Sequence, residues 1–167
     1  MALLKIARLG HPVLLGRAAE VMDPTSPEIQ RLLADMAETM ADAGGIGLAA
    51  PQVHVALRLF LFRAGPGAPQ VLINPEVTPL GEEIETAWEG CLSIPGLRGA
   101  VPRPARVRFR ALNQEGDVIE GEAEGIVARV IQHENDHLNG VLYLSRMPDL
   151  TQLGFTEELA RREKETA

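Results

Sequence analysis

The sequence predicts one compact domain in which helices and short strands are mixed. A length of 167 residues is enough to bury a substantial core but too short for a separate substrate domain. Two stretches repeat apolar residues at helical spacing, and several shorter apolar stretches lie between Gly, Pro and Asn breaks. The chain carries no repeats, low-complexity tracts or linker, so we expect residues 1–167 to fold as one unit.

The first expected helix begins at Ser26, which is followed by proline and glutamate, as is typical of helix N-termini. It ends at Gly44. Its apolar positions recur at helical spacing: Ile29, Leu32, Leu33, Met36 and Met40. The two methionines suit a cofactor pocket as well as a core, but the spacing favours core packing.

Residues 45–52 are rich in glycine and alanine, which predicts a loop whose backbone can approach a ligand closely. Short strands are expected at 56–63, 71–73, 106–112 and 118–122. Within 106–112, three arginines alternate with Val107, Phe109 and Ala111. One face of this strand should therefore pack inward, while the arginines meet water.

A second helix is expected from Gly125 to Asn139, where an Asn-Gly pair favours termination. Its apolar residues are Ile126, Val127, Val130, Ile131 and Leu138, so the helix should be largely buried. A third pattern, at 156–164, is that of a charged and solvated helix.

The buried helix carries the string His133-Glu134-Asn135-Asp136-His137, which has the form of a helical metal-binding signature. At about 100° per residue, the two histidines lie roughly 40° apart around the helix, and Glu134 lies roughly 60° beyond His137. Both imidazoles can then bind one metal ion while Glu134 reaches a water on that metal. The pattern predicts a metallohydrolase.

Catalytic zinc-type sites usually have three protein ligands and keep the next position for water, so one ligand remains to be found. Cys91 is the strongest candidate, because the glycine before it permits a tight bend that can turn the thiol toward the helix. A buried, inert cysteine is the alternative, and the residues by themselves leave both roles open.

Charge and composition exclude several partners. A net charge of −7 and a pI near 5.1 argue against binding to phosphate backbones, so we expect no nucleic-acid partner. No apolar run approaches the length of a membrane span, and Lys5 interrupts any signal-peptide core. The lone cysteine cannot form an internal disulfide, which suits a reducing cytoplasm.

Three segments resemble the motifs of the peptide deformylases in order and spacing: GIGLAAPQ at 45–52, EGCLS at 89–93 and QHENDHL at 132–138. The resemblance extends through GHPVL at 10–14 and through residues 94–103, so it covers nearly the whole chain. It implies a compact α+β catalytic domain in which short strands surround a central metal-bearing helix.

The resemblance also implies the reaction, namely removal of the N-formyl group from the initiator methionine of nascent polypeptides with release of formate. Cys91, His133 and His137 would hold one divalent metal ion, and Glu134 would pass a proton from the bound water to the leaving amine. The Gln52 side-chain amide and the Leu92 backbone N–H would stabilise the developing oxyanion. Substrate-binding positions carried over from the family are Gly45, Ile46, Gly47, Glu89, Arg98 and Val130.

Several neighbouring side chains have two interpretations. Helical spacing points Asp136 away from the metal, which favours support of the helix through a base such as Arg103 over substrate contact. Arg98 is expected either to contact the peptide or to anchor Glu89. Trp88 is expected either to wall the methionine pocket or to lie in the core.

Two other functions compete with deformylation. A zinc endopeptidase would take a downstream glutamate, Glu157 or Glu158, as its third ligand, but that segment looks solvated. A binding module with a structural metal would need a fourth ligand, commonly a second cysteine, and the chain has one.

The metal itself is not determined by the ligand types. One thiolate and two imidazoles accommodate Fe(II), Zn, Co or Ni. The resemblance points to Fe(II). It likewise points to N-formylmethionyl nascent peptides near the ribosome exit as the partners.

Overall fold

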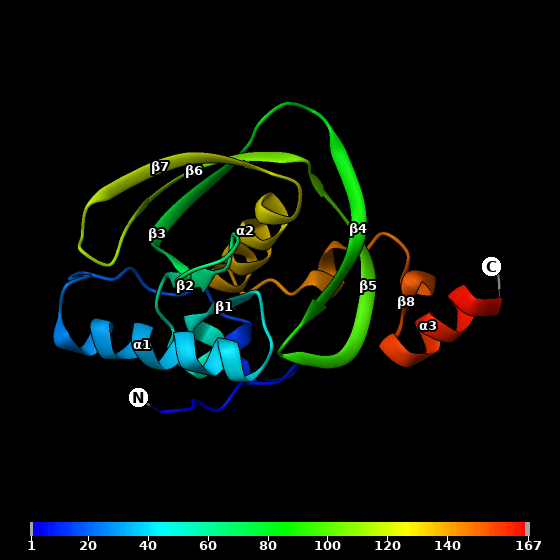
Figure 1. Ribbon diagram of the computed structural model, residues 1–167, viewed down its shortest axis with the longest axis horizontal. Helices are drawn as coiled ribbons and strands as arrows, with labels where there is room; N and C mark the ends of the chain where they lie inside the picture. Colours follow the sequence, from blue (N-terminus) through cyan, green and yellow to red (C-terminus); the bar gives the residue numbers. More distant parts are fainter. Residues whose placement is uncertain (1, 166–167) are drawn as a thin grey trace.

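Two β-sheets surround helix α2 in the protein, whose computed structural model describes residues 2–165 (Figure 1). The helices are α1 (Pro27–Asp42), α2 (Gly125–Leu138) and α3 (Thr156–Glu165). The strands are β1 (Gly47–Ala49), β2 (Leu59–Phe62), β3 (Gln70–Pro79), β4 (Ile84–Cys91), β5 (Ile94–Pro104), β6 (Arg106–Leu112), β7 (Val118–Glu124) and β8 (Leu153–Phe155). The first sheet has the order β1-β2-β3-β6-β7 and the second the order β4-β5-β8. The expected α+β arrangement, with strands around a central helix, is confirmed.

Helix α1 begins as its sequence predicts. The Ser26 hydroxyl accepts a hydrogen bond from the Ile29 N–H at 3.4 Å, which satisfies one of the free donors of the first turn. Past its end, Gly44 adopts φ +66°, a left-handed conformation that favours glycine. Met36 and Met40 are both fully buried, so they pack in the core as predicted.

Strands β6 and β7 form an antiparallel pair whose two faces differ as expected. Val107 and Ala111 are buried beneath the sheet. On the opposite face, the exposed arginines of β6 form ion pairs with glutamates of β7 at 2.8–3.3 Å. Arg106 and Arg108 pair with Glu122, and Arg110 pairs with Glu120. Exposed pairs of this kind contribute little to stability, so this face is a solvated surface.

Helix α2 lies at the centre of the fold, between the two sheets (Figure 1). Its residues Ala128, Ile131 and Leu138 are buried in one cluster with Phe60 and Phe62 of β2. The helix ends at Leu138, close to the predicted position. Ile126 differs from the expectation of a buried position, because it lies in the first turn and is 64% exposed.

The second sheet was not expected from the sequence. Strands β4 and β5 pair continuously from Ile84 opposite Pro104 to Gly90 opposite Arg98, and β8 adds a third strand. Their prolines and glycines argue against strands in a sequence. The sheet tolerates Pro102 and Pro104 because β8 pairs with β5 only at 97–99, which leaves the outer edge of β5 unpaired at the prolines.

Residues 45–52 are more regular than the expected loop, since they form strand β1 and a short 3₁₀ helix, Ala50–Val53. The tail forms α3, exposed and charged as predicted. None of the helices within residues 2–165 combines the length and the apolar composition of a membrane span. The expected single domain 1–167 includes residues 1, 166 and 167, which lie outside the described residues.

Candidate active site

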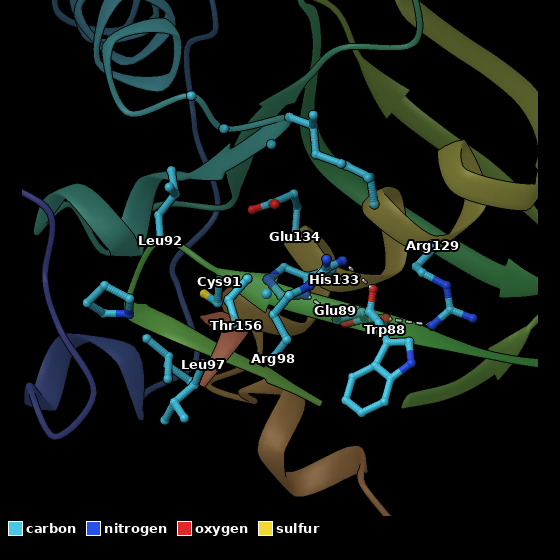
Figure 2. Close-up of a pocket in the computed structure, with 18 of the residues that line it drawn as sticks. Trp88, Glu89, Cys91, Leu92, Leu97, Arg98, Arg129, His133, Glu134 and Thr156 are labelled. Carbon is cyan, nitrogen blue, oxygen red and sulfur yellow. Dashed lines mark hydrogen bonds and ion pairs between the residues drawn. The ribbon is translucent and has the colours of Figure 1, made fainter. Parts of the chain in front are cut away.

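Three candidate metal ligands meet between α2 and the end of β4. Figure 2 shows Cys91 and His133, with Glu134 nearby. His133 and His137 lie one turn apart on α2, with ring centroids 5.1 Å apart. The Cys91 Sγ lies 3.3 Å from His137 Nε2. One ligand atom from each of the three side chains falls within 4.8 Å of the others, a spacing that a single metal ion can bridge.

The local structure of β4 turns Cys91 toward the helix. The β4–β5 register shifts between Gly90 and Cys91, so Cys91 pairs with Ile94 across a tight hairpin turn. This irregularity re-aims the side chain at the strand end, as β-bulges commonly do. The irregularity follows Gly90 directly, whereas the tight turn itself lies at Leu92 and Ser93, after Cys91. Cys91 is only partly buried.

Glu134 lies beside the ligands and is 4% exposed. Its Oε2 atom is buried without a hydrogen-bond partner among the described residues. A Cβ on Gly47 would collide with this carboxylate, so the glycine of β1 makes room for it. Burial raises the pKa of Glu134 to about 7, which suits a group that exchanges protons.

Gln52 is buried, and its amide orientation is defined at both ends. Its Oε1 accepts the Ala49 N–H at 2.9 Å. Its Nε2 therefore faces the site, where it donates to Ser93 Oγ at 3.2 Å and lies 3.6 Å from Cys91 Sγ. A buried N–H₂ group held in this position is a preorganised donor.

A buried charge network holds the histidine-bearing helix. The Glu89 carboxylate accepts hydrogen bonds from Arg103 and Arg129 and lies 2.9 Å from His133 Nδ1. Burial by itself would raise the pKa of Glu89, but hydrogen bonds from His133 and Arg103 hold it at about 2. A carboxylate on Nδ1 orients the ring and leaves Nε2 for a metal. Glu89 therefore positions His133, although it also lines the pocket.

Arg103 also binds Asp136, with 2.9 Å between Nη1 of Arg103 and Oδ2 of Asp136. This confirms the expected support of the helix by Arg103. Arg146 pairs with the other carboxylate oxygen of Asp136 at 2.6 Å. Arg98 does not anchor Glu89 and instead donates to the Trp88 carbonyl at 3.2 Å.

A pocket of about 550 Å³ opens in front of these groups. Trp88 lies in its wall and is partly exposed. The predicted substrate positions all line it: Gly45, Ile46, Gly47, Glu89, Arg98 and Val130. Other residues that line the pocket or contact the site residues were not predicted from the sequence: Ser93, Arg129, Tyr143, Arg146 and Thr156. None of these residue types is informative without the fold.

The donor set fits a catalytic metal ion with an open position. Within residues 2–165, Cys91, His133 and His137 are the only group of three such side chains close enough to share an ion. Neither alternative from the sequence fits, because this group includes no fourth ligand and neither Glu157 nor Glu158. Both glutamates are exposed on α3, and Glu158 pairs with Arg161 at 2.8 Å.

Comparison with known proteins agrees with this site. The chain is 50% identical over 163 residues to peptide deformylase 1 of Bordetella pertussis, covering 92% of this chain and 93% of the relative. It is 48% identical over 170 residues to peptide deformylase 1 of Prochlorococcus marinus, covering 95% and 88%.

Solved structures are similar over the same span. The crystal structure of peptide deformylase from Thermotoga maritima has a TM-score of 0.84 at 41% identity and covers 88% of this chain and 99% of that one. The actinonin complex of the Synechococcus elongatus enzyme has a TM-score of 0.84 at 39% identity and covers 89% and 81%. The family model for polypeptide deformylase matches residues 3–153. The chain therefore belongs to the polypeptide deformylase family.

Proposed function

We propose that this protein is a metal-dependent peptide deformylase, an amide hydrolase that removes the formyl group from N-formylmethionyl peptides and releases formate. The observation that carries the proposal is the meeting of Cys91, His133 and His137 beside the buried Glu134 carboxylate, whose Oε2 atom has no hydrogen-bond partner within residues 2–165. Family membership supports the reaction class.

Cys91 Sγ and the two histidines would hold one divalent ion, with His133 coordinating through Nε2 because Glu89 lies on its Nδ1. When bound, the ion supplies a water that ionises near neutral pH. We propose Fe(II) as the native metal, with Zn, Ni or Co as substitutes, since one soft thiolate and two imidazoles accept all four.

Glu134 would act as base and then as acid. It would take a proton from the attacking water and deliver it to the amine nitrogen as the C–N bond of the formamide breaks. The carboxylate is buried, and its Oε2 atom has no hydrogen-bond partner within residues 2–165, so it is available for both transfers.

The Gln52 amide and the Leu92 backbone N–H would donate to the formyl oxygen as it becomes negative. Such donors stabilise the transition state most when neighbouring contacts already hold them in place. The hydrogen bond from Ala49 N–H to Gln52 Oε1 supports this role, because it directs the Gln52 nitrogen toward the site.

The substrate would occupy the pocket in front of these groups. Gly45, Ile46, Gly47 and Val130 would contact the methionine, and Arg98 at the rim would contact the peptide backbone. Residues 1–167 would belong to a single catalytic domain. We place the reaction in the cytoplasm near the ribosome exit, where nascent chains emerge; the reducing environment would keep the Cys91 thiol free.

The decisive experiment compares Glu134→Ala with His133→Ala for metal content and formate release from formyl-Met-Ala. Glu134→Ala should retain metal and lose almost all turnover, because it removes the proton carrier and no ligand. His133→Ala should lose metal and turnover together. Cleavage of an internally quenched peptide tests the endopeptidase alternative, because an endopeptidase would cleave it and a deformylase would not. A metal-free Glu134→Ala protein, or one with near-normal turnover, would refute the assigned role.

Metal identity needs its own test. Protein purified without oxygen should contain iron and should lose activity on exposure to peroxide, because ferrous iron and a thiolate are both oxidisable. Protein reloaded with Ni or Co should resist the same treatment. Iron-loaded protein that survives peroxide unchanged would count against Fe(II).

A further inference from the structure

Tyr143 is a buried residue beside the metal ligands to which the proposed reaction assigns no part. It belongs to a short 3₁₀ helix, η3 (Tyr143–Arg146), which follows α2. It is 1% exposed and is not among the residues that line the pocket. Its hydroxyl oxygen has no hydrogen-bond partner within residues 2–165. A buried hydroxyl without a partner costs free energy, so a phenylalanine would be the better residue if packing were its only role.

Several contacts hold the Tyr143 ring in place. The ring stacks on His133, with centroids 6.2 Å apart and planes inclined by 25°. Gly99 of β5 also lies against it, because a Cβ at Gly99 would be 3.2 Å from Tyr143 Cε2. Arg146, at the end of η3, pairs with Asp136 at 2.6 Å and ties the short helix to α2. The ring, and the hydroxyl at its end, therefore have little freedom to move.

Cys91 lies within electrostatic reach of that hydroxyl. It packs against the buried cluster that contains Tyr143, together with Ile94 and Leu142. Burial raises the pKa of Tyr143 to about 12, and negative charge on Cys91 contributes to the rise. The phenol therefore keeps its proton at neutral pH and faces the sulfur as a hydrogen-bond donor.

The sulfur of Cys91 supplies the acceptor that this hydroxyl lacks. A metal-bound cysteine is a thiolate, and hydrogen bonds to a charged acceptor are stronger than those to a neutral one. Gln52 Nε2 lies 3.6 Å from the same sulfur, but the proposed reaction uses that amide for the formyl oxygen. Because Tyr143 lies outside the pocket, a bound peptide leaves its hydroxyl free to serve the thiolate.

We propose that Tyr143 is a positioning residue of the metal centre: its ring orients His133, and its hydroxyl donates a hydrogen bond to the Cys91 thiolate that forms when metal binds. The inference rests on the metal-ligand set of the proposed function. Hydrogen bonds to a ligand sulfur tune the electronic properties of the metal, so Tyr143 acts on the reaction through Cys91 and not by touching the substrate.

The test uses protein loaded with Co(II), whose thiolate-to-metal charge-transfer band reports the electron density on sulfur. Tyr143→Phe keeps the ring and removes only the hydroxyl. The band should move to longer wavelength, because a thiolate that loses a hydrogen bond gives up electrons more readily. Affinity for Co(II), measured by competition with a chelator, should fall about tenfold, which corresponds to one hydrogen bond to a charged group.

Two further variants separate the hydroxyl from the ring. Thr39→Val is the matched control, because Thr39 also carries a buried hydroxyl but lies in α1 and donates to the Asp35 carbonyl. It should leave the band and the affinity unchanged. Tyr143→Leu removes the ring as well, so it should weaken Co(II) binding more than Tyr143→Phe does, because His133 loses its stacking partner.

The outcomes distinguish this inference from the proposed function. A band that stays in place in Tyr143→Phe would disprove the hydrogen bond, even if affinity fell, because a purely structural loss does not change the sulfur. Equal affinities in Tyr143→Leu and Tyr143→Phe would disprove the role of the ring. If the wild-type protein shows no such band, Cys91 is not a ligand and the inference fails with it. Formate release from formyl-Met-Ala is measured separately, and its absence would refute deformylation while the band still decides the role of Tyr143.

Discussion

Single residues of the site are held by contacts that leave one atom free for chemistry. Gln52 is anchored through its oxygen, so its nitrogen faces Cys91 and Ser93. Glu134 is buried with one oxygen unpartnered, and Gly47 provides the space for it. Side chains positioned in this way contribute mainly to stabilising the transition state.

Gln52→Leu should lower kcat by roughly a hundredfold, because it removes a preorganised donor to the developing oxyanion. KM should change less. Steady-state kinetics with formyl-Met-Ala measures both constants. Gln30→Leu is the control, since the Gln30 amide bonds to the Pro24 and Gln114 carbonyls outside the pocket. A rise in KM alone would identify a ground-state contact instead.

Gly47→Ala should also lower kcat, because the added methyl group would displace the Glu134 carboxylate. Metal content should stay unchanged, since no ligand moves. Gly16→Ala is the matched control, because a Cβ at Gly16 has no neighbour within 4 Å. Metal content and kcat are measured for both variants. Normal turnover in Gly47→Ala would show that catalysis does not depend on the present position of the Glu134 carboxylate.

At the scale of elements, Arg103 of β5 joins β4 to α2 by binding Glu89 and Asp136. The side chains of all three residues are at most 7% exposed. Buried ion pairs add little net stability, but removing one partner leaves the others buried and charged. The network therefore makes the position of the metal-bearing helix depend on the second sheet.

Arg103→Met should destabilise the protein by about 3–5 kcal/mol, because it leaves two buried carboxylates without their shared partner. The control is Arg108→Met, which removes an exposed pair with Glu122 and should cost about 0–1 kcal/mol. Urea unfolding of both variants gives the two free energies of unfolding. Equal losses would mean that the buried network is not a structural link.

For the whole molecule, the ligand set spans two parts of the fold. Cys91 comes from the second sheet, and His133 and His137 come from the helix packed on the first. A metal ion bound to all three would connect these parts in the folded state, whereas an unfolded chain offers no such preformed site.

Removing the metal should therefore lower the melting temperature. At a free metal concentration about a thousandfold above Kd, binding stabilises the folded state by about 4 kcal/mol. For a chain of this length, that corresponds to roughly 10 °C. Calorimetry with and without a chelator measures the shift. Cys91→Ser, which loses the thiolate ligand, should show a much smaller shift, and an equal shift in both proteins would exclude Cys91 as a ligand.

Features that depend on local spacing are readable from the residues alone. Helical periodicity located α1 and α2, and alternation located β6 with its arginine face outward. The spacing of His133 and His137 predicted a shared metal face, because four residues make about one helical turn. Each of these features depends on residues that lie close together in the chain, so no distant contact is needed to specify it.

Features that depend on residues far apart in the chain emerge only from the folded protein. The proline-containing strand β5 exists because β4 and β8 pair with it, and local preference argues against it. Residue spacing left the role of Cys91 open until the β4 bulge brought it within 3.3 Å of His137. Likewise, Arg129 and Thr156 join the site from separate elements. Side chains far apart in the chain meet only through packing of the whole fold, which local patterns do not encode.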